Sequence, residues 1–159
     1  MTNPLKIFIL NDEATTENLA ARLAEQLKAK HKDRCVIFLK GELGTGKTTF
    51  VRAFLRALSF SGTVRSPTYT LVEPYEVDGF DIYHMDWYRL PSEAALEEMG
   101  VLEYFHQEAI LLIEWPLQAS MKIPKPDLIL HFKLEGETRS LTFEIPEGGA
   151  QDLKEGIFA

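Results

Sequence analysis

The sequence predicts an α/β fold, a three-layer domain whose mixed sheet contains antiparallel hairpins. Three observations support this prediction. The apolar run 36–39 leads into a glycine-rich loop at 41–48, and an amphipathic helix pattern follows. The run 109–115 is apolar up to a single carboxylate, which is typical of a strand buried on both faces of a parallel sheet. Two pairs of strand-like segments are each joined by a short turn, which favours hairpins.

The N-terminal part predicts a strand at 5–10 followed by a helix. Asn11 and Asp12 are capping residue types at the expected helix start. Leucines recur every four residues on one face of this helix, which should run to about His31, where basic residues suit the negative end of the helix dipole.

A second strand is expected over 35–40, immediately before the glycine-rich loop. The helix after the loop has Phe50, Phe54 and Leu58 at intervals of four residues, and it should end near Leu58. Strand, loop and helix therefore form one continuous unit.

The middle of the chain predicts an antiparallel hairpin. Residues 68–77 and 80–85 are β-prone, and Asp78-Gly79 between them is a tight-turn pair. Ser92 is then expected to cap a short acidic helix, with another helical turn or two over 101–107.

After the buried strand at 109–115, a second hairpin is expected from 127–134 and 138–145. We expect a single domain over 1–146. Residues 147–159, which open on two glycines, are expected to form a mobile tail.

The loop 41–48 fits the phosphate-binding (P-loop) pattern Gly-x4-Gly-Lys-[Ser/Thr] at every position. Its glycines let successive backbone N–H groups converge on an anion, and the following helix adds its positive N-terminal dipole. Lys47 is expected to reach the β- and γ-phosphates as a catalytic group, and the Thr48 hydroxyl to hold Mg²⁺. We therefore expect a P-loop NTPase-like fold with a nucleotide site formed by Gly44, Thr45, Gly46, Lys47, Thr48 and Thr49.

Such a loop usually works with a second metal anchor on a neighbouring strand. Glu114 would lie at the carboxyl edge of the sheet, where open α/β sheets bind ligands; the alternative is an ordinary solvated carboxylate. His84 and Asp86 alternate along their strand and should face the same side. Asp86 is a candidate to orient the attacking water or to hold Mg²⁺ through water, or only to cap the following loop.

Flanking polar residues are candidates for sensing the nucleotide. Ser66 and Thr68 lie where GTP-binding switch proteins carry their γ-phosphate-sensing loop, and Arg65 is a candidate charge for the transition state; an ordinary Ser-Pro turn is the alternative. Thr15 or Thr16 is a candidate contact for the base or sugar. No Asn-Lys-x-Asp motif for guanine is present.

The charge and hydropathy of the chain argue against an autonomous nucleic-acid-binding protein and against a secreted or membrane protein. The net charge is −7 at pH 7 and no dense Lys/Arg run occurs, so autonomous nucleic-acid binding is not expected. The N-terminus lacks the pattern of a signal peptide, and no apolar stretch is long enough to span a membrane. We expect a cytoplasmic protein without membrane contact.

Four segments together resemble the bacterial TsaE (YjeE) family of tRNA threonylcarbamoyladenosine biosynthesis ATPases. They are the phosphate-binding loop, Ser-Pro-Thr-Tyr-Thr-Leu at 66–71, His-Met-Asp-Trp-Tyr-Arg-Leu at 84–90 and Ile-Glu-Trp at 113–115. They keep the order of that family, and Thr16 fits its N-terminal pattern. The last three segments are more specific than the loop.

The resemblance implies ATP hydrolysis, with Mg²⁺ held by Thr48 and Glu114 and with ATP and ADP as the nucleotides. It also implies a partner complex of TsaD with TsaB, which installs threonylcarbamoyl on adenosine 37 of tRNA, so that tRNA contact belongs mainly to the partners. Tyr88 and Arg89 join Arg65, Ser66 and Thr68 as candidate switch or partner-contacting residues.

Two other classes remain open on the residues alone. A small-molecule kinase shares this size and loop, but it usually needs a basic lid, and basic residues after Glu114 are dispersed. A nucleotide-dependent regulatory switch is the second alternative. The missing guanine motif argues against its GTP-binding form.

Overall fold

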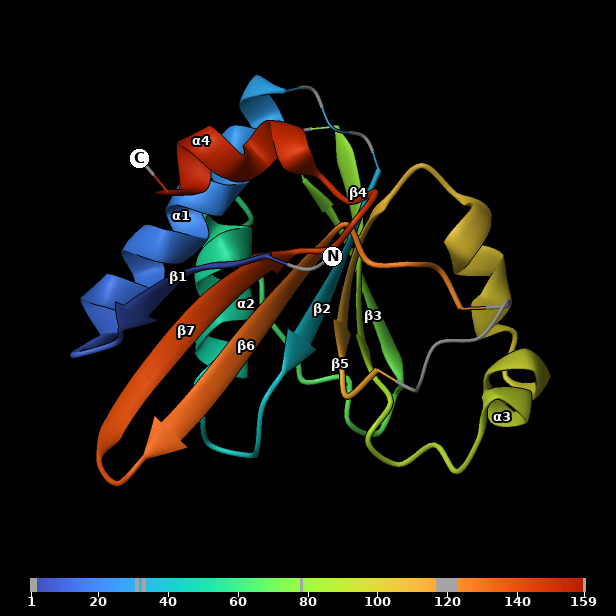
Figure 1. The fold of residues 1–159 in the computed structure, drawn as a ribbon. Coiled ribbons are helices and arrows are strands. Elements are labelled where there is room, and N and C mark those ends of the chain that lie inside the picture. The colour runs from blue at the N-terminus through green and yellow to red at the C-terminus, as the bar shows by residue number, and fades with distance from the viewer. Residues whose placement is uncertain (1–2, 31, 33, 78, 117–122, 159) are drawn as a thin grey trace.

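The computed structural model describes residues 3–30, 32, 34–77, 79–116 and 123–158. Its strands are β1 (Asn3–Ile9), β2 (Cys35–Lys40), β3 (Val72–Val77), β4 (Phe80–Asp86), β5 (Ile110–Glu114), β6 (Leu128–Glu135) and β7 (Thr138–Ile145). Its α-helices are α1 (Glu13–Ala29), α2 (Lys47–Ala57), α3 (Glu93–Glu98) and α4 (Lys154–Phe158). Two 3₁₀ helices, η1 (Val101–His106) and η2 (Gln151–Leu153), complete the set (Figure 1).

All seven strands form one sheet in the order β1-β7-β6-β2-β5-β4-β3. β2 pairs in parallel with both β5 and β6, and β4 pairs in parallel with β5. The β3–β4 and β6–β7 hairpins and the β1–β7 pair are antiparallel. The prediction of an α/β fold with a mixed sheet and antiparallel hairpins is therefore confirmed.

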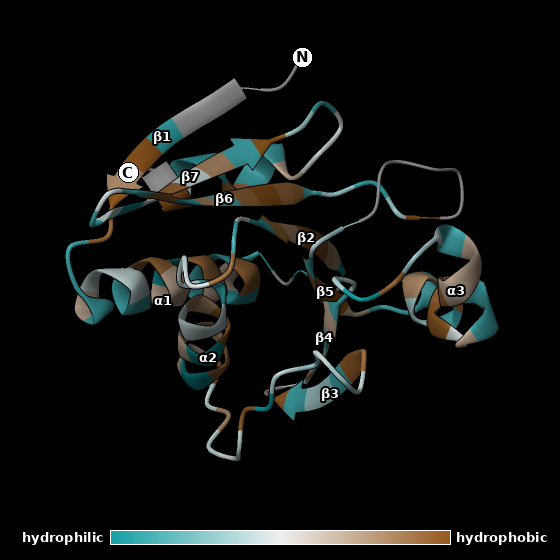
Figure 2. Cartoon of the chain, turned by 90° about the horizontal axis from the view of Figure 1, so that it is seen from below, coloured by the Kyte–Doolittle hydropathy of each residue, from teal (hydrophilic) through white to brown (hydrophobic). Residues whose placement is uncertain are grey.

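The sheet separates two apolar cores. One core packs the sheet against α1 and α2, with Leu23, Phe50 and Phe54 among its fully buried side chains. The other packs the opposite face against α3 and η1 through Leu96 and Phe105. Figure 2 shows the sheet curving around α1 and α2, with α3 on the other side. These are the three layers expected of the fold, and they leave the ends of the central strands to form the site.

The first hairpin begins later than the sequence predicts. The expected strand 68–77 starts only at Val72, because the preceding residues form a turn in which the Leu71 N–H donates to the Pro67 carbonyl (2.7 Å). Asp78, from the predicted tight turn, lies outside the described residues, as does His31 at the predicted end of α1. Ser92 precedes α3 as expected, but its side chain caps no N–H group of the described residues.

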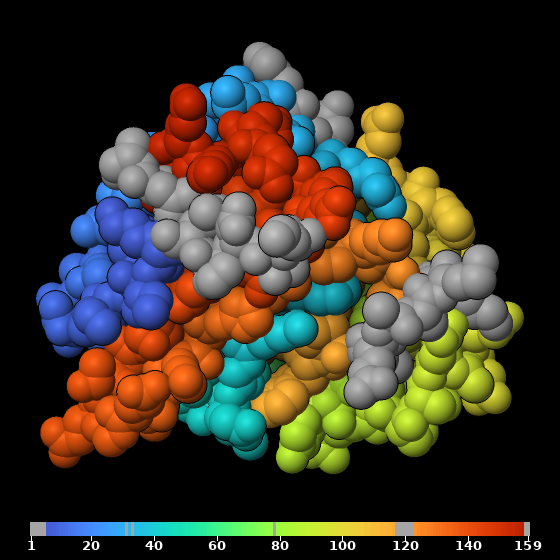
Figure 3. All heavy atoms as spheres, viewed as in Figure 1, coloured from blue at the N-terminus to red at the C-terminus, as the bar shows by residue number. Residues whose placement is uncertain are grey.

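The prediction of a mobile tail over 147–159 differs from the structure. η2 and α4 occupy most of this segment, and the side chains of Leu153 and Ile157 are 0% and 1% exposed. The Arg22 guanidinium on α1 donates to the Ile157 carbonyl (3.2 Å). Figure 3 shows the red C-terminal segment packed on the blue N-terminal elements. Apolar side chains four residues apart give the segment a face that α1 buries.

No helix among the described residues is both long and apolar enough to cross a bilayer.

Candidate nucleotide site

The phosphate-binding loop leaves the start of α2 open. Gly46 stands at the N-cap of α2 with φ +107°, a conformation that favours glycine, and no side chain among the described residues caps the helix there. The first N–H groups of an α-helix have no partner within the helix. An uncapped helix start that follows a glycine loop is therefore available to an anion.

The loop is also fixed to the rest of the sheet. Gly41, with φ +152°, lies so close to β6 that an added Cβ would be 2.5 Å from the Phe132 carbonyl oxygen. The Thr45 hydroxyl donates to the Glu42 carbonyl (2.7 Å), and Thr45 is 1% exposed. The Thr45 side chain therefore shapes the loop from within.

Lys47, the first residue of α2, points back under the loop and is only 5% exposed. Its ammonium donates to the Gly41 carbonyl and lies 3.9 Å from the centre of the Trp115 ring. Burial lowers the pKa of Lys47, while the carboxylates of Glu114 and Asp86 act in the opposite direction. This places a desolvated cation beneath the loop, where it would attract a polyphosphate.

Two carboxylates face this lysine from neighbouring strand ends. Asp86, the last residue of β4, is the register partner of Glu114, the last residue of β5. Both are buried and line a cavity of about 310 Å³ together with Lys47, Thr48 and Gly46. The structure thus brings the three predicted catalytic residues and the predicted metal ligands into one cavity.

Each carboxylate already has a protein partner. Glu114 Oε2 lies 2.6 Å from His84 Nε2, and both side chains are buried. Asp86 Oδ1 accepts from the Tyr88 N–H (2.9 Å) and Oδ2 accepts from the Thr68 hydroxyl (3.2 Å). Asp86 therefore caps the following loop and also borders the cavity, so both its predicted role at the site and its structural role remain compatible with its position.

The predicted loop residues separate into two groups. Ser66 and Thr68 line the cavity, with their hydroxyl oxygens 2.7 Å apart. The backbone N–H of Arg65 donates to the Tyr75 hydroxyl (3.0 Å), and the Arg65 side chain is exposed outside the lining.

Tyr88 and Arg89 also lie outside the lining of this cavity. The Tyr88 ring packs 4.9 Å from the ring of Trp115, and the Arg89 guanidinium lies 4.7 Å from the centre of the Tyr69 ring. Tyr69 is 84% exposed, so this aromatic and basic surface is accessible to another molecule.

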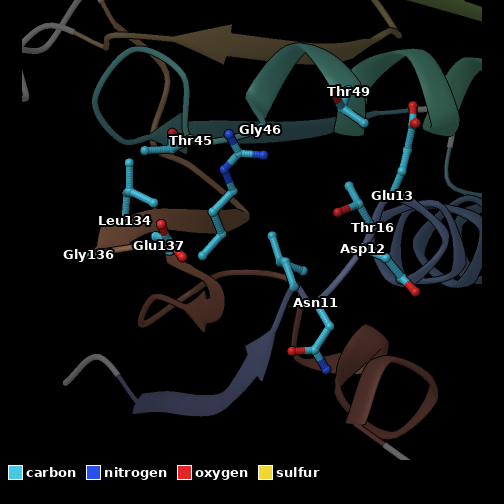
Figure 4. Close-up of a pocket in the computed structure, with 12 residues that line it drawn as sticks. Asn11, Asp12, Glu13, Thr16, Thr45, Gly46, Thr49, Leu134, Gly136 and Glu137 are labelled. Atoms are coloured by element: carbon cyan, nitrogen blue, oxygen red, sulfur yellow. The ribbon is translucent and has the colours of Figure 1, made fainter.

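A second cavity of about 540 Å³ adjoins the first and shares Gly46, Thr49 and Arg139 with it. Figure 4 shows its labelled residues, which come from the segment that leads into α1 and from α1 itself, from the phosphate-binding loop and α2, and from the β6–β7 hairpin. Thr16 lines this cavity, whereas Thr15 does not, because its hydroxyl donates to Asp12 Oδ1 (2.7 Å) at the start of α1.

Arg139 lines the candidate site although the sequence did not single it out. It borders both cavities although it lies about ninety positions from the phosphate-binding loop. No local pattern marks it. Only the folding of the β6–β7 hairpin beside the loop brings it there.

The donor set fits Mg²⁺. A hydroxyl (Thr48) and two carboxylates (Asp86 and Glu114) supply the hard oxygen ligands that this ion prefers. The described residues contain no cluster of three His, Cys, Asp or Glu side chains that could hold a metal ion. Mg²⁺ is usually bound through one or two carboxylates, substrate phosphates and water, so a complete protein cage is not required.

Comparison with known proteins points to one family. The sequence model described as "Threonylcarbamoyl adenosine biosynthesis protein TsaE" matches residues 10–142. A Haemophilus influenzae protein named tRNA threonylcarbamoyladenosine biosynthesis protein TsaE is 37% identical over 131 residues, which are 82% of this chain and 83% of that protein. Its Aquifex aeolicus namesake is 40% identical over 138 residues, covering 85% and 92%. The crystal structure of Bacillus subtilis YdiB matches with a TM-score of 0.77 at 28% identity, over 99% of this chain and 95% of that one.

Proposed function

This chain belongs to the TsaE family, whose role is in tRNA threonylcarbamoyladenosine biosynthesis, and we propose that it is the ATP-binding and ATP-hydrolysing subunit of that machinery. In this proposal it works with Mg²⁺ and supports a TsaD–TsaB complex in forming N6-threonylcarbamoyladenosine at position 37 of tRNA. One observation carries the proposal: the uncapped start of α2, Lys47 and the paired carboxylates Asp86 and Glu114 converge on a single cavity.

Each group has a distinct role in this proposal. The loop amides and Lys47 bind the phosphates, and the Thr48 hydroxyl and Glu114 hold Mg²⁺. The metal ion supplies positive charge that offsets the charge developing on the phosphoryl group. Asp86, held in place by the Tyr88 N–H and the Thr68 hydroxyl, accepts a hydrogen bond from the attacking water and orients it.

The adjoining cavity of about 540 Å³ has room for the nucleoside. Thr16 and Asn11 offer a hydroxyl and an amide there, Leu10 offers apolar contact, and Arg139 stands where the two cavities meet. Polar groups at fixed positions around a mainly concave site are the usual means of ligand orientation.

The net charge of −7 supports a division of labour with the partners. An acidic chain is repelled by the phosphate backbone of tRNA, so tRNA contact in this proposal belongs mainly to TsaD and TsaB. The exposed Tyr69, Tyr88 and Arg89 beside the cavity are the surface on which a partner would act.

The test measures nucleotide binding and turnover with and without partners. We expect calorimetry to show Mg²⁺-dependent binding of ADP and ATP, slow hydrolysis by the chain alone, and faster hydrolysis with a reconstituted TsaD–TsaB pair. A supplied or ordered charge at such sites changes rates by about 10³–10⁵. Formation of the modified tRNA nucleoside is the second readout.

The same assays separate the other two classes. A kinase would release ADP faster when a small acceptor is added, and a GTP-dependent switch would prefer GTP to ATP. Full-speed hydrolysis by the chain alone, indifferent to TsaD and TsaB, would contradict the proposed role and indicate a free-standing enzyme.

A further inference from the structure

His84 is a buried titratable residue to which the proposed function assigns no role. It lies on β4, two residues before Asp86, and it is 1% exposed. We infer that His84 is a positioning residue, whose imidazole fixes the orientation of the Glu114 carboxylate at the metal site. This inference rests on the proposed function, because it concerns the same carboxylate.

The hydrogen bond between the His84 and Glu114 side chains is short and buried. His84 Nε2 lies 2.6 Å from Glu114 Oε2, and the two side chains are 1% and 7% exposed. Hydrogen bonds to a carboxylate are stronger than those between neutral groups, and exclusion of water strengthens them further. A carboxylate buried without such a partner would be strongly disfavoured.

The other ring nitrogen indicates which atom carries the proton. His84 Nδ1 is buried and has no hydrogen-bond partner among the described residues. A proton there would make a buried donor without an acceptor, which is costly. The Nε2–H tautomer therefore fits this environment, with the proton donated to Glu114. In this tautomer the imidazole donates a single hydrogen bond, from Nε2–H to Glu114.

Strand register explains why His84 supports Glu114 without replacing it. In the β4–β5 pair, Asp86 is opposite Glu114 and His84 is opposite Leu112, two residue pairs further from the strand ends. Asp86 and Glu114 border the cavity, and His84 does not. The imidazole thus holds one carboxylate oxygen from the interior of the sheet, and Glu114 Oε1 is the oxygen not engaged by it.

The chain offers a matched control. His131 on β6 and Glu144 on β7 form a second histidine–glutamate pair, with Nε2 2.7 Å from Oε1. Their side chains are 40% and 15% exposed, and neither residue lines the two nucleotide cavities. Removing this imidazole deletes the same chemistry at a place where no nucleotide or metal ligand is expected.

The experiment measures ADP affinity by calorimetry in EDTA and across a Mg²⁺ titration. For His84→Leu, the Mg²⁺ concentration that gives half of the affinity gain should rise about tenfold, as loss of such supporting bonds to metal ligands typically costs 10–100-fold in metal affinity. ADP affinity in EDTA should stay within about twofold, because the loop amides are unchanged. His131→Leu should match the wild type in both measurements. An unchanged Mg²⁺ titration in folded His84→Leu would overturn the inference.

Two further variants decide the question if His84→Leu does not fold. The amide nitrogen of His84→Gln can replace the Nε2 donor, whereas the shorter side chain of His84→Asn cannot reach Glu114. The Gln variant should retain the wild-type Mg²⁺ requirement and the Asn variant should not. Equal Mg²⁺ requirements in these two variants would overturn the inference.

A double variant distinguishes positioning from direct metal binding. If His84 acts through Glu114, then Glu114→Ala with His84→Leu should need no more Mg²⁺ than Glu114→Ala alone. An additional loss would show that His84 acts independently of Glu114. Wild-type protein that binds ADP equally with and without Mg²⁺ would overturn the proposed metal site itself, a result distinct from failure of the His84 variants alone.

Discussion

Two groups of strands in the sheet are built differently. The parallel block (β2, β4 and β5) includes two strands, β2 and β5, that are buried over almost their whole length. The antiparallel wing (β1, β6 and β7) has side chains that alternate between buried and more exposed along the second half of β7, and its β6–β7 tip is exposed. The wing also leaves Ile7 and Ile9 exposed. The block is covered on both faces, and the wing is partly open to solvent.

This difference separates the two parts of the site. The block supplies two buried carboxylates, Asp86 and Glu114. The exclusion of water strengthens their electrostatic interactions. The wing supplies exposed residues to the larger cavity, Arg139 and Glu137 among them. We therefore expect substitutions of site residues at the carboxyl ends of the block's strands to affect chemistry strongly, and substitutions on the wing to affect only nucleotide affinity.

The largest effect is expected from Lys47→Ala. This variant should lose measurable hydrolysis and bind ADP at least tenfold more weakly, because a hydrogen bond to a charged group contributes about 1.5–3 kcal/mol. The fold should survive, since the substitution removes a cation that burial disfavours. Calorimetry and thermal unfolding measure the two quantities. Unchanged affinity in a folded variant would refute the assignment of the phosphate-binding loop.

Glu114→Ala should separate binding from chemistry. Hydrolysis should fall about tenfold or more and the Mg²⁺ requirement should rise, while ADP affinity in EDTA changes less than about threefold because the loop amides still hold the phosphates. Steady-state hydrolysis across a Mg²⁺ titration provides the measurement. Wild-type metal dependence in this variant would assign the second ligand to another residue, with Asp86 the next to test.

On the wing, Arg139→Ala should weaken ADP binding by about threefold, the scale of an exposed charge interaction. Hydrolysis at saturating ATP should stay at the wild-type rate. Lys133→Ala is the control, because Lys133 lies on the same hairpin but pairs with Glu135 (3.2 Å) outside both nucleotide cavities. If Arg139→Ala abolished hydrolysis at saturation, the wing would take part in chemistry and the comparison would fail.

The smallest effect is expected at the amino end of the block, at Cys35. Burial raises the pKa of this thiol to about 12 from an ordinary 9.0, so almost no thiolate exists at pH 8. Dithionitrobenzoate should react with the native chain far more slowly than with the unfolded chain. Cys35→Ala should leave ADP affinity unchanged.

The raised pKa of the Cys35 thiol should also lower the stability of the folded chain at alkaline pH. The unfolded thiol ionises near pH 9 and the folded one only near 12, so stability should decline as the pH rises through that window. Chemical denaturation between pH 8 and 10 should show less decline for Cys35→Ala. Equal declines in the two proteins would contradict the burial of the thiol.

Local patterns predicted the parts of the molecule that depend on neighbours in sequence. The phosphate-binding loop and the apolar strand ending at Glu114 are contiguous motifs, and the structure has both where they were expected. The strand predicted before Val72 is absent because remote partners hold these β-prone residues in a turn. One such partner is Asp86, which accepts a hydrogen bond from the Thr68 hydroxyl. Strand propensity yields to such tertiary contacts.

The packing of the C-terminal segment and the position of Arg139 could not be predicted, and the physical reason is the same for both. Leu153 and Ile157 have helical spacing, but their burial depends on α1, which lies more than a hundred residues away. Arg139 reaches the site only because β6 pairs with β2. Partners so far apart in sequence leave no signal in a local pattern.

The contact between Lys47 and Trp115 should make binding at the site detectable by tryptophan fluorescence. The chain has two tryptophans: Trp87 is sealed in a core at 1% exposure, and Trp115 carries the lysine ammonium 3.9 Å from its ring centre. Trp115 also has φ +52°, a left-handed conformation that the backbone adopts directly after Glu114. A phosphate that draws Lys47 away would change the electrostatic environment of this indole and leave that of Trp87 unaltered. Intrinsic fluorescence would then report occupancy of the loop without any label.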